Sequence, residues 1–425
     1  MKELIKDLKE LISINSVSVK TDSKEYPFGK DMRLALDKAL SLCDKYGMKT
    51  VNLDNMVGYA EIGEGKKTVG ILVHLDIVPA GEGWNSNPFE LSCIDGKLIG
   101  RGVVDDKGPA IAVIHGIKEL IDEGHQFNNK VRIIFGQAEE TGDWIDMEYY
   151  KEKEGVVDFG FTPDADFPAI YAEKGIGRIK IVFSKQDTCF ESIEGGVALN
   201  MVPGNCVGRY RSDEDGTITT LEVKGKSAHG STPEDGINAI SKFMAECKPQ
   251  NRCTLVDFFD QFIKMEYDGS SLGGYAKDEA SGEITYNYGM IKEKDDKIEL
   301  EVDVRFPVTC DIYEILESIK QRISEGGFSN VNITLENVTE PVFMDKDDPF
   351  INTLVNTFQE VSGIEAEPMV IGGGTYARAM SNIVAFGPMI PGRELTEHQP
   401  NEYIFEEDLH LAKNVYKKAI KKITC

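Results

Sequence analysis

The sequence predicts an α/β fold, in which a discontinuous and mostly parallel α/β domain carries a second, inserted α+β domain. Three observations lead to this prediction. The chain alternates strand and helix signals over residues 1–177, alternates apolar and polar residues with period two over 178–338, and returns to the first pattern over 339–425. A length of 425 residues also exceeds what one hydrophobic core usually supports, so at least two domains are expected.

Two apolar runs in the first part of the chain are predicted strands, and a helix is predicted between them. KTVGILVHLD (67–76) and KVRIIFGQ (130–137) are mostly apolar at their centres, which is typical of parallel strands that are covered on both faces. The segment from Asp105 to Gly124 is a predicted helix, because Pro109 suits a first turn and Gly124 suits a helix end. This order of elements favours a parallel sheet.

Between residues 178 and 338 the hydrophobic pattern changes to period two. TITTLEVKGKSAHG (217–230) and KIELEVDVRFP (297–307) alternate apolar and polar residues, as antiparallel strands with one exposed face do. The Gly- and Ser-rich stretch 267–283 between them is a predicted loop. A predicted helix over 349–363 and a basic C-terminal helix then restore the first pattern, so the two outer segments are expected to form one domain.

The composition excludes several classes of partner. The formal net charge is −25, which disfavours binding to nucleic acid and attraction to anionic membranes. No apolar stretch is long enough to span a bilayer, and the N-terminal segment MKELIKDLKELISI lacks the apolar core of a signal peptide. The eight cysteines are scattered without CxxC spacing. We therefore expect a cytoplasmic protein with reduced thiols.

Polar residues that could hold a metal ion follow the first predicted strand. His74 and Asp76 are two residues apart at its end, so their side chains point to the same side of the sheet. Binding sites of open α/β sheets form at the carboxyl ends of strands. The pair could be a metal ligand with a supporting carboxylate. A histidine that is bonded to a neighbouring aspartate for structure alone is the more common case.

Two pairs of adjacent carboxylates follow further along the chain. Asp105 and Asp106 precede the predicted helix, where acidic residues commonly cap the first turn. Glu139 and Glu140 end the second strand, where a solvated turn is the simpler interpretation. Neighbouring strand residues point to opposite faces, so one glutamate could bind a cation while the other reaches a water molecule.

Two later residues complete the candidate set. Asp164 lies between prolines after a third short strand, and His398 lies in an irregular polar stretch. Each could be an ordinary turn or loop residue. Together with the earlier candidates, however, they provide two histidines and three carboxylates at strand ends or in loops. Such a set could hold two divalent ions, with one carboxylate bridging them.

At this point the chain resembles the M20 family of co-catalytic metallopeptidases, and within it the PepV-like dipeptidases. Nine stretches carry the resemblance, follow the order of the family and span nearly the whole chain. They are VHLDIVPAGEGWNSNPF, GRGVVDDKGP, QAEETG, TPDADFP, GGVALNMVP, GKSAHGSTPEDGINAI, DVRFP, GGGTYAR and PGRELTEHQPNEY. The resemblance implies that residues 1–177 and 339–425 form a catalytic domain and that residues 178–338 form a lid domain.

The resemblance also implies the metal ligands. One ion would be held by His74, Asp105 and Asp164, and the other by Asp105, Glu140 and His398, so Asp105 would bridge the two. Two histidines and three carboxylates favour Zn²⁺, and the many oxygen ligands also allow Mn²⁺ or Co²⁺.

Two acidic residues beside the ligands receive different roles from the resemblance. Asp76 would orient His74. Glu139 would act as general base and then as general acid on the water molecule that bridges the ions.

In the lid domain, the resemblance implies that His229 stabilises the oxyanion and that Arg305 holds the substrate carboxylate. Asn200 and the backbone of Gly373 and Gly374 would help to hold that carboxylate. The period-two pattern places Arg305 on the polar face of its strand, so we expect it outside the core and able to face a cleft. A surface salt bridge is the alternative.

The function expected from the resemblance is the metal-dependent hydrolysis of dipeptides by an enzyme with two metal ions. Its partner would be a short peptide, and neither nucleic acid nor a membrane. A monomer is favoured over a homodimer, because the lid of the PepV group mimics the second subunit of dimeric relatives. The alternatives are a deacylase acting on N-acyl amino acids, a peptide-binding protein without catalysis, and an acidic structural protein without metal.

Overall fold

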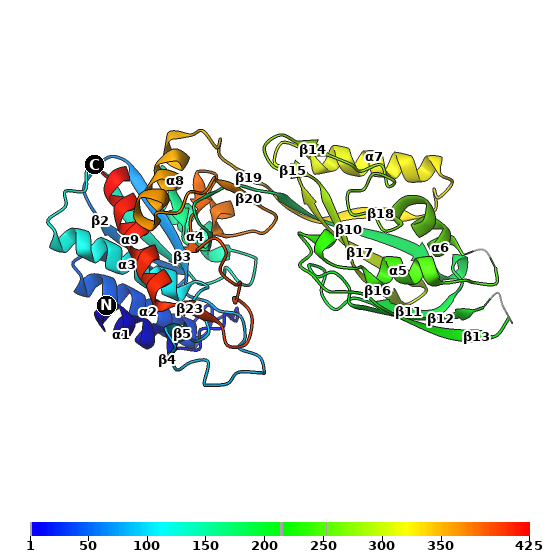
Figure 1. Cartoon of the computed structure of the whole chain (residues 1–425), viewed down its shortest axis with the longest axis horizontal. Helices are drawn as coiled ribbons and strands as arrows, with labels where there is room; N and C mark the ends of the chain where they lie inside the picture. The colour runs from blue at the N-terminus through cyan, green and yellow to red at the C-terminus, as the bar shows by residue number, and fades with distance from the viewer. Residues whose placement is uncertain (1, 213–215, 252) are drawn as a thin grey trace. The chain divides into compact units, whose positions relative to one another are not determined.

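The chain folds into two units, and the colour gradient of Figure 1 shows that one of them contains both ends of the chain. The computed structural model describes residues 2–212, 216–251 and 253–425. Unit 1 comprises Met1–Tyr171, Phe343–Met369 and Gly374–Cys425, and unit 2 comprises Ala172–Val342 and Val370–Gly373. Parallel and antiparallel strands combine with helices in this chain, so the predicted α/β fold class is confirmed.

A mixed sheet forms the centre of unit 1. Seven of its nine strands lie in the order β1-β2-β6-β3-β7-β21-β9. The four central strands β6, β3, β7 and β21 run parallel, whereas β1, β2 and β9 pair in antiparallel fashion at the edges. The strand bounds are β1 (Lys49–Leu53), β2 (Val57–Ile62), β3 (Thr68–His74), β6 (Lys130–Gly136), β7 (Phe159–Thr162), β9 (Ile170–Glu173) and β21 (Ile383–Ala385).

The two apolar runs identified in the sequence are the neighbouring parallel strands β3 and β6. Almost every residue of β3 is buried, as expected for a strand that is covered on both faces. The register pairs His74 with Gly136, so both strands end at the same level. The segments that follow β3 and β6 therefore begin side by side.

Helices surround this sheet in unit 1 (Figure 1). They are α1 (Lys2–Ile12), α2 (Lys30–Lys45), α3 (Lys107–Asp122), α4 (Ile145–Glu154), α8 (Pro349–Ser362) and α9 (Glu406–Ile423), with the single turn η4 (Tyr376–Ala379). Small sheets of β4 (Ser92–Ile94), β5 (Lys97–Ile99) and β23 (Tyr403–Phe405), and of β8 (Ala165–Asp166) and β22 (Pro388–Met389), lie outside the main sheet.

The sequence explains several helix ends in unit 1. Asp348 caps α8 by accepting a hydrogen bond from the N–H of Phe350 at 2.7 Å, and Pro349 occupies the first position of that helix. Gly363 ends α8 with φ at 73°, a conformation that favours glycine. Helix α3 is buried over most of its length, because its apolar residues cover nearly all faces.

Unit 2 contains a seven-stranded sheet in which every pairing is antiparallel. Its strands lie in the order β13-β12-β11-β16-β17-β10-β18. The strand bounds are β10 (Gly175–Ser184), β11 (Phe190–Gly195), β12 (Asn205–Arg211), β13 (Ile218–Lys224), β16 (Thr285–Lys294), β17 (Lys297–Phe306) and β18 (Asn332–Thr339). The period-two segment 297–307 is therefore an antiparallel strand as expected, whereas of segment 217–230 only Ile218–Lys224 is one.

Helices pack on the apolar face of the unit 2 sheet. They are α5 (Ala239–Glu246), α6 (Thr254–Phe258) and α7 (Ile312–Glu325), together with the short π-helix η3 (Phe259–Ile263). Unit 2 also contains the single 3₁₀ turns η1 (Lys185–Asp187) and η2 (Pro233–Asp235). The alternate residues Ile298, Leu300, Val302, Val304 and Phe306 of β17 join these helices in one buried cluster. The predicted loop at 267–283 contains only the short strands β14 (Lys277–Asp278) and β15 (Gly282–Glu283). Two further short strands, β19 (Val342–Phe343) and β20 (Met369–Ile371), occur where the chain passes between the units.

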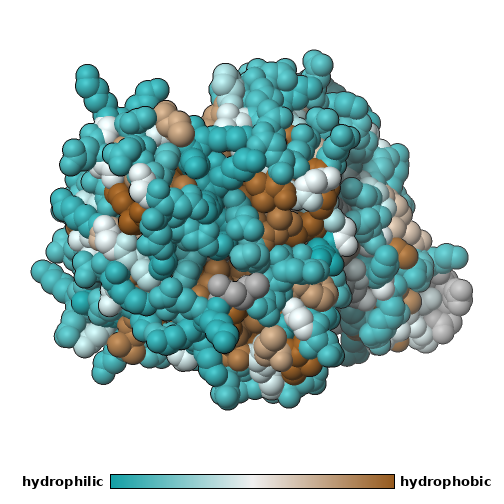
Figure 2. Space-filling model, turned by 60° about the vertical axis from the view of Figure 1, so that its left-hand side comes forward, coloured by the Kyte–Doolittle hydropathy of each residue, from teal (hydrophilic) through white to brown (hydrophobic). Residues whose placement is uncertain are grey.

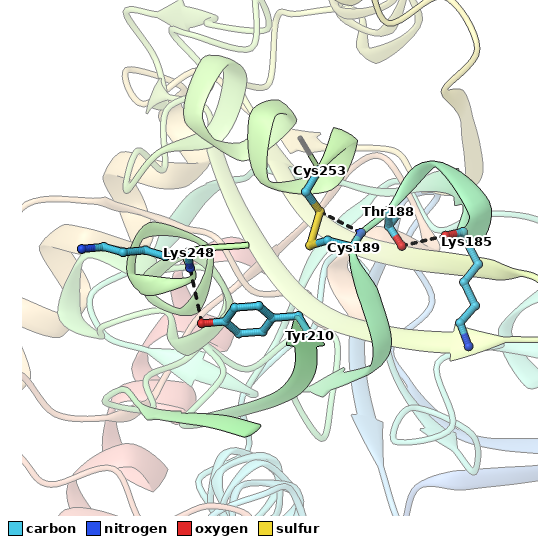
Figure 3. The surroundings of a disulfide bond; sticks show 6 residues. All are labelled: Lys185, Thr188, Cys189, Tyr210, Lys248 and Cys253. Carbon is cyan, nitrogen blue, oxygen red and sulfur yellow. Dashed lines mark hydrogen bonds between the residues drawn. A yellow bond between two sulfur atoms is a disulfide. The ribbon is translucent and has the colours of Figure 1, made fainter. Parts of the chain in front are cut away.

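Two of the eight cysteines form a disulfide, which corrects the expectation that all are reduced. Cys189 lies just before β11 and Cys253 just before α6, and their sulfur atoms are bonded (Figure 3). The Cys253 sulfur also accepts the N–H of Cys189 at 3.1 Å. The two residues are 64 positions apart, so only the packing of unit 2 brings them together and no local spacing in the sequence indicates the pair. The other six cysteines are not part of a disulfide.

Hydrophilic residues predominate on the face shown in Figure 2, with hydrophobic residues in smaller groups between them. This surface agrees with a net charge of −25. Among the helices of the described residues, none is both long enough and apolar enough to cross a membrane.

Candidate metal centre

The candidate residues of unit 1 meet where its central parallel strands end. His74 is the last residue of β3, Glu139 and Glu140 follow β6, and Asp164 follows β7. Strand β3 lies between β6 and β7, so the three strand ends are neighbours at one edge of the sheet. Asp105 comes from the segment that leads into α3. This edge is where open α/β sheets place their binding sites.

The first group of possible metal ligands contains His74, Asp105 and Asp164. The Nε2 atom of His74 lies 2.8 Å from Oδ1 of Asp105 and 3.8 Å from Oδ2 of Asp164. One ligand atom from each of the three residues lies within 4.8 Å of the others. All three side chains are largely shielded from solvent, so an ion at this position would be held by protein ligands more than by water.

The second group contains Asp105, Glu140 and His398. The Nε2 atom of His398 lies 2.9 Å from Oδ2 of Asp105 and 3.2 Å from Oε2 of Glu140. These ligand atoms also lie within 4.8 Å of one another. Asp105 faces the first group with one carboxylate oxygen and the second group with the other, which is the geometry of a bridging ligand. The structure thus brings together all five residues that the sequence suggested as metal ligands.

The chemistry of these residues fits two divalent cations. Among the described residues, Nε2 of the buried His74 makes no well-aligned hydrogen bond, as expected for a ligand atom. Burial and neighbouring carboxylates raise the pKa of Asp164 and of Glu139 well above their usual values. Burial and the charge of Asp105 likewise raise the pKa of Glu140. So many buried acidic groups are costly without positive charge, and cations at these positions would remove that cost.

The histidines offset part of this negative charge. Hydrogen bonds to Asp105 and Glu140 raise the pKa of His398 to about 11. Burial alone would raise the pKa of Asp105, but the neighbouring imidazoles of His398 and His74 lower it below the usual value. The histidines thus compensate only part of the negative charge, and imidazole with carboxylate is the donor set that Zn²⁺, Mn²⁺ and Co²⁺ accept.

Glu139 and Glu140 lie in a turn, and not in the strand. Strand β6 ends at Gly136, so the argument that strand alternation separates the two glutamates is wrong. The chain leaves the sheet before it reaches them, and the conformation of the turn decides where each carboxylate points. Glu140 contacts His398, whereas Glu139 belongs to neither ligand group. The two side chains still have different surroundings, but the conformation of the turn causes this difference, and not the alternation of a strand.

Asp76 connects this turn with His74. Its carboxylate accepts the N–H of Glu139 at 3.3 Å and the N–H of Glu140 at 3.0 Å. The Nδ1 atom of His74 lies 3.4 Å from the Asp76 carboxylate and 3.0 Å from its backbone oxygen. One buried side chain therefore orients a candidate ligand and also fixes the turn that carries the two glutamates.

Asp106 and Asp105 differ sharply in their surroundings although they are adjacent and joined by a cis peptide bond. Asp106 occupies the N-cap position of α3, but its side chain makes no capping bond to the helix. It accepts the N–H of His74 at 3.1 Å instead. Asp106 therefore occupies the capping position but does not cap the helix with its side chain. Asp105 points to the candidate metal centre instead.

Glu402 is a supporting residue that the sequence did not reveal. Its buried carboxylate accepts the N–H groups of Gly102 at 3.0 Å and Val104 at 2.8 Å, and it pairs with Arg101 at 2.6 Å. It thereby fixes the segment that ends in Asp105. A glutamate whose main partners are backbone groups about 300 positions away has no signature in sequence spacing.

The residues suggested for substrate binding in unit 2 have defined surroundings of their own. Arg305 is only 5% exposed, forms a two-bond ion pair with Asp303 at 2.9 and 2.8 Å, and donates to the backbone oxygen of Gly372. The expectation that Arg305 lies outside the core is thus wrong in terms of burial, because residues on both faces are buried at this end of β17. The alternative of a salt bridge is present, in a buried form.

His229 and Asn200 lie in irregular segments of unit 2. Strand β13 ends at Lys224, and exposed His229 contacts the Ser231 hydroxyl through Nδ1 at 2.7 Å. Asn200 accepts the N–H of Gly230 on its backbone oxygen at 2.7 Å. Gly373 belongs to unit 2 and Gly374 to unit 1. Their roles remain expectations at this stage.

Comparison with known proteins identifies relatives along the whole chain. The sequence model of peptidase family M20/M25/M40 matches residues 70–422. A Staphylococcus epidermidis protein named "Putative dipeptidase" is 34% identical over 457 aligned residues, which cover 98% of this chain and 96% of the relative. A Staphylococcus saprophyticus protein of the same description is 33% identical and covers 99% of this chain and 97% of the relative.

Solved structures with low sequence identity share the fold. Human carnosine dipeptidase 1 superposes with a TM-score of 0.64 at 16% identity, covering 100% of this chain and 96% of that protein. Aminoacylhistidine dipeptidase from Vibrio alginolyticus superposes with a TM-score of 0.65 at 11% identity, covering 99% and 96%. At these identities the likeness concerns the fold alone.

Proposed function

We propose that the substrates of this chain are dipeptides. The premise is that the chain belongs to peptidase family M20/M25/M40 and hydrolyses peptide bonds. The proposal includes two divalent metal ions at the candidate metal centre and Glu139 as the group that moves protons. One observation carries it: Asp105 faces both ligand groups, while Glu139 stands beside them and belongs to neither. The names of the two staphylococcal relatives support dipeptides as the substrate class.

In this proposal His74, Asp105 and Asp164 hold one ion, and Asp105, Glu140 and His398 hold the other. Zn²⁺ is favoured, and Mn²⁺ or Co²⁺ also suit the ligands. When bound, such ions polarise the peptide carbonyl and lower the pKa of a water molecule to about 7, which supplies hydroxide at neutral pH. Asp76 engages Nδ1 of His74, so Nε2 on the other side of the ring would hold the first ion.

Glu139 takes the proton from the attacking water and passes it to the amine that leaves. In the metal-free site, burial and the charge of Asp164 raise the pKa of this carboxyl group, which favours the form that has taken up a proton. Its position depends on Asp76, which binds the N–H groups of Glu139 and Glu140 with its two carboxylate oxygens. A shift of about 1 Å in the position of such a group can cost about 10²-fold in rate.

The roles of the unit 2 residues belong to the same proposal and rest on the family resemblance. His229 would stabilise the oxyanion, and unit 2 would act as the lid of the enzyme. Arg305 would bind the free carboxylate of the substrate, helped by Asn200, Gly373 and Gly374. Asp303 supports this role of Arg305, because a guanidinium that is fixed by a carboxylate loses less conformational entropy when it binds a second one. A cytoplasmic location and a monomeric state remain predictions.

The test is a metal reconstitution series with a substrate panel. The protein is freed of metal, reloaded with Zn²⁺, Mn²⁺ or Co²⁺, and incubated with dipeptides and with N-acetyl amino acids. We expect two ions per chain and release of free amino acids from the dipeptides. Release from N-acetyl amino acids alone would identify a deacylase. Binding of dipeptides without release would identify a peptide-binding protein, and protein that takes up no ion would contradict the metal centre itself.

A further inference from the structure

Asp146 is a buried carboxylate that lies behind the turn of the two glutamates. It is the second residue of α4 and has no exposed surface. Its Oδ2 atom accepts the N–H groups of Gln137 at 2.5 Å and Ala138 at 3.0 Å, and the hydroxyl of Tyr376 at 2.6 Å. Burial raises its pKa to about 6, so it is still mainly ionised at neutral pH and attracts these donors.

Tyr376 reaches the same turn from η4 in the C-terminal segment of unit 1. It is fully buried, and its hydroxyl accepts the N–H of Ala138 at 3.2 Å while it donates to Asp146. Its side chain lies so close to Gly136 that a Cβ atom there would come within 2.3 Å of the hydroxyl oxygen. The same ring meets the imidazole of His74 edge to face, with 6.0 Å between centroids. Tyr376 therefore contacts both the turn and a candidate metal ligand.

Two buried carboxylates thus bind four successive backbone N–H groups of this turn. Asp146 binds those of Gln137 and Ala138, and Asp76 binds those of Glu139 and Glu140. Trp144 adds a further bond, because its indole N–H donates to the backbone oxygen of Glu139 at 3.2 Å. A buried polar group that loses its partner is costly, so this network favours a single conformation of the turn.

We propose that Asp146 and Tyr376 are positioning residues that fix the turn carrying Glu139 and Glu140. Neither residue belongs to a ligand group among the described residues, and the pair acts through its hydrogen bonds to the backbone of the turn. This inference deepens the proposed function and rests on it for the role of Glu139.

The chain offers a matched control for a test of this pair. The hydroxyl of the buried Tyr46 donates to the buried Asp7 at 2.5 Å, also within unit 1. Tyr46 packs against His115 of α3. Tyr376→Phe and Tyr46→Phe therefore each remove one hydroxyl from a buried Tyr–Asp hydrogen bond, but only the first bond supports the turn. Both variants are compared with the wild type as metal-loaded full-length protein.

Hydrogen–deuterium exchange and steady-state kinetics give two independent readouts. In Tyr376→Phe we expect peptides covering residues 137–142 to exchange at least fivefold faster and kcat to fall at least tenfold, with KM within twofold of wild type. In Tyr46→Phe both quantities should stay within twofold of wild type, even if its melting temperature falls equally. Asp146→Asn should give the larger effects, and if it does not fold, Tyr376→Phe alone decides.

The inference is overturned if Tyr376→Phe matches Tyr46→Phe in exchange and kcat. It is also overturned if exchange accelerates while kcat is unchanged, because the turn would then move without consequence for Glu139. If the wild type does not hydrolyse dipeptides, the proposed function fails. The exchange rates then still decide whether Asp146 and Tyr376 fix the turn, so the two failures are distinguishable.

Discussion

The Nε2 atom of His398 lies 2.9 Å from Oδ2 of Asp105, although the two residues come from different segments of the discontinuous unit 1. The other oxygen of Asp105 lies 2.8 Å from His74. The candidate metal centre therefore exists only when the C-terminal segment has folded back onto the N-terminal sheet. Asp105 is the residue that both halves of the centre share.

Asp105→Ala should remove both ions, whereas Asp164→Ala should remove mainly one, because Asp164 belongs to a single ligand group. The measurement is the number of metal ions per chain after gel filtration, by elemental analysis of protein loaded with Zn²⁺. Equal losses in the two variants would contradict the shared position of Asp105.

Glu139→Ala should keep both ions and lose about 10²–10⁴-fold in kcat, since a general base contributes about this much. Glu139 lies outside both ligand groups, so its loss leaves every ligand in place. Glu140→Ala is the matched variant one position away, and it should lose metal as well as activity. If Glu139→Ala kept most of its activity, the assignment of the base would be wrong.

The sequence predicts the residues at the ends of parallel strands best. His74 and Asp76 could be recognised because apolar runs locate strand ends, and period two places both side chains on one side. For Glu139 and Glu140 the same reasoning gave a wrong cause, because the strand ends at Gly136. Tertiary packing helps to decide where a strand ends, so the local sequence pattern alone does not predict the directions of side chains near that end.

Other residues could not be predicted at all, because their partners are set by the folded chain. Asp146 and Glu402 act on backbone N–H groups, and such groups leave no mark in the sequence of the residue that binds them. Cys189 and Cys253 pair across 64 positions for the same reason. The burial of Arg305 was missed because alternation describes one strand and ignores what covers its polar face.

Glu402→Gln should destabilise the protein by about 1–3 kcal/mol, the usual cost of an unsatisfied buried group. Both oxygens of Glu402 accept hydrogen bonds from N–H groups. In the glutamine variant an NH₂ group replaces one oxygen, and this donor then faces an N–H donor without an acceptor between them. Denaturant unfolding measures this loss, and metal affinity should fall with it because Asp105 follows the affected segment. Glu394→Gln is the control, since Glu394 is exposed and accepts a hydrogen bond from the Tyr403 hydroxyl at 3.0 Å. A similar loss in both variants would contradict the special role of Glu402.

Glu119→Gln should lower the melting temperature at pH 7 and have little effect near pH 2. Burial alone would raise the pKa of Glu119, but hydrogen bonds from Lys413 and Lys417 lower it from 4.5 to about 2. A lowered carboxyl pKa stabilises the folded state above pH 4.5, and this contribution is lost as the pH falls from 4.5 to 2. The contact joins α3 to α9, and melting curves across this pH range measure it.

Glu360→Gln is the control for this pH dependence. Glu360 also pairs with two lysines of α9, Lys418 and Lys422, and its pKa is likewise lowered to about 2. Its side chain is exposed, so solvent and salt screen its ion pairs. We expect a smaller change in melting temperature than for Glu119→Gln. The reverse order would show that burial does not decide the strength of these contacts.

Removal of the metal ions should destabilise the protein, and more at pH 8 than at pH 6. Burial and neighbouring carboxylates raise the pKa of Glu139 and Asp164 in the metal-free site, so its folded state holds protons that the unfolded chain releases. The ordinary pKa is 4.5 for Glu139 and 3.8 for Asp164. Because the pKa of each is raised in the folded protein, the free energy of unfolding falls as the pH rises from the ordinary pKa towards the raised one. Melting curves with and without a chelator at both pH values measure the difference. Glu139→Ala has one buried carboxylate fewer and keeps its ligands, so chelation at pH 8 should cost it less than wild type. An equal cost would mean that repulsion among these carboxylates does not limit the metal-free protein.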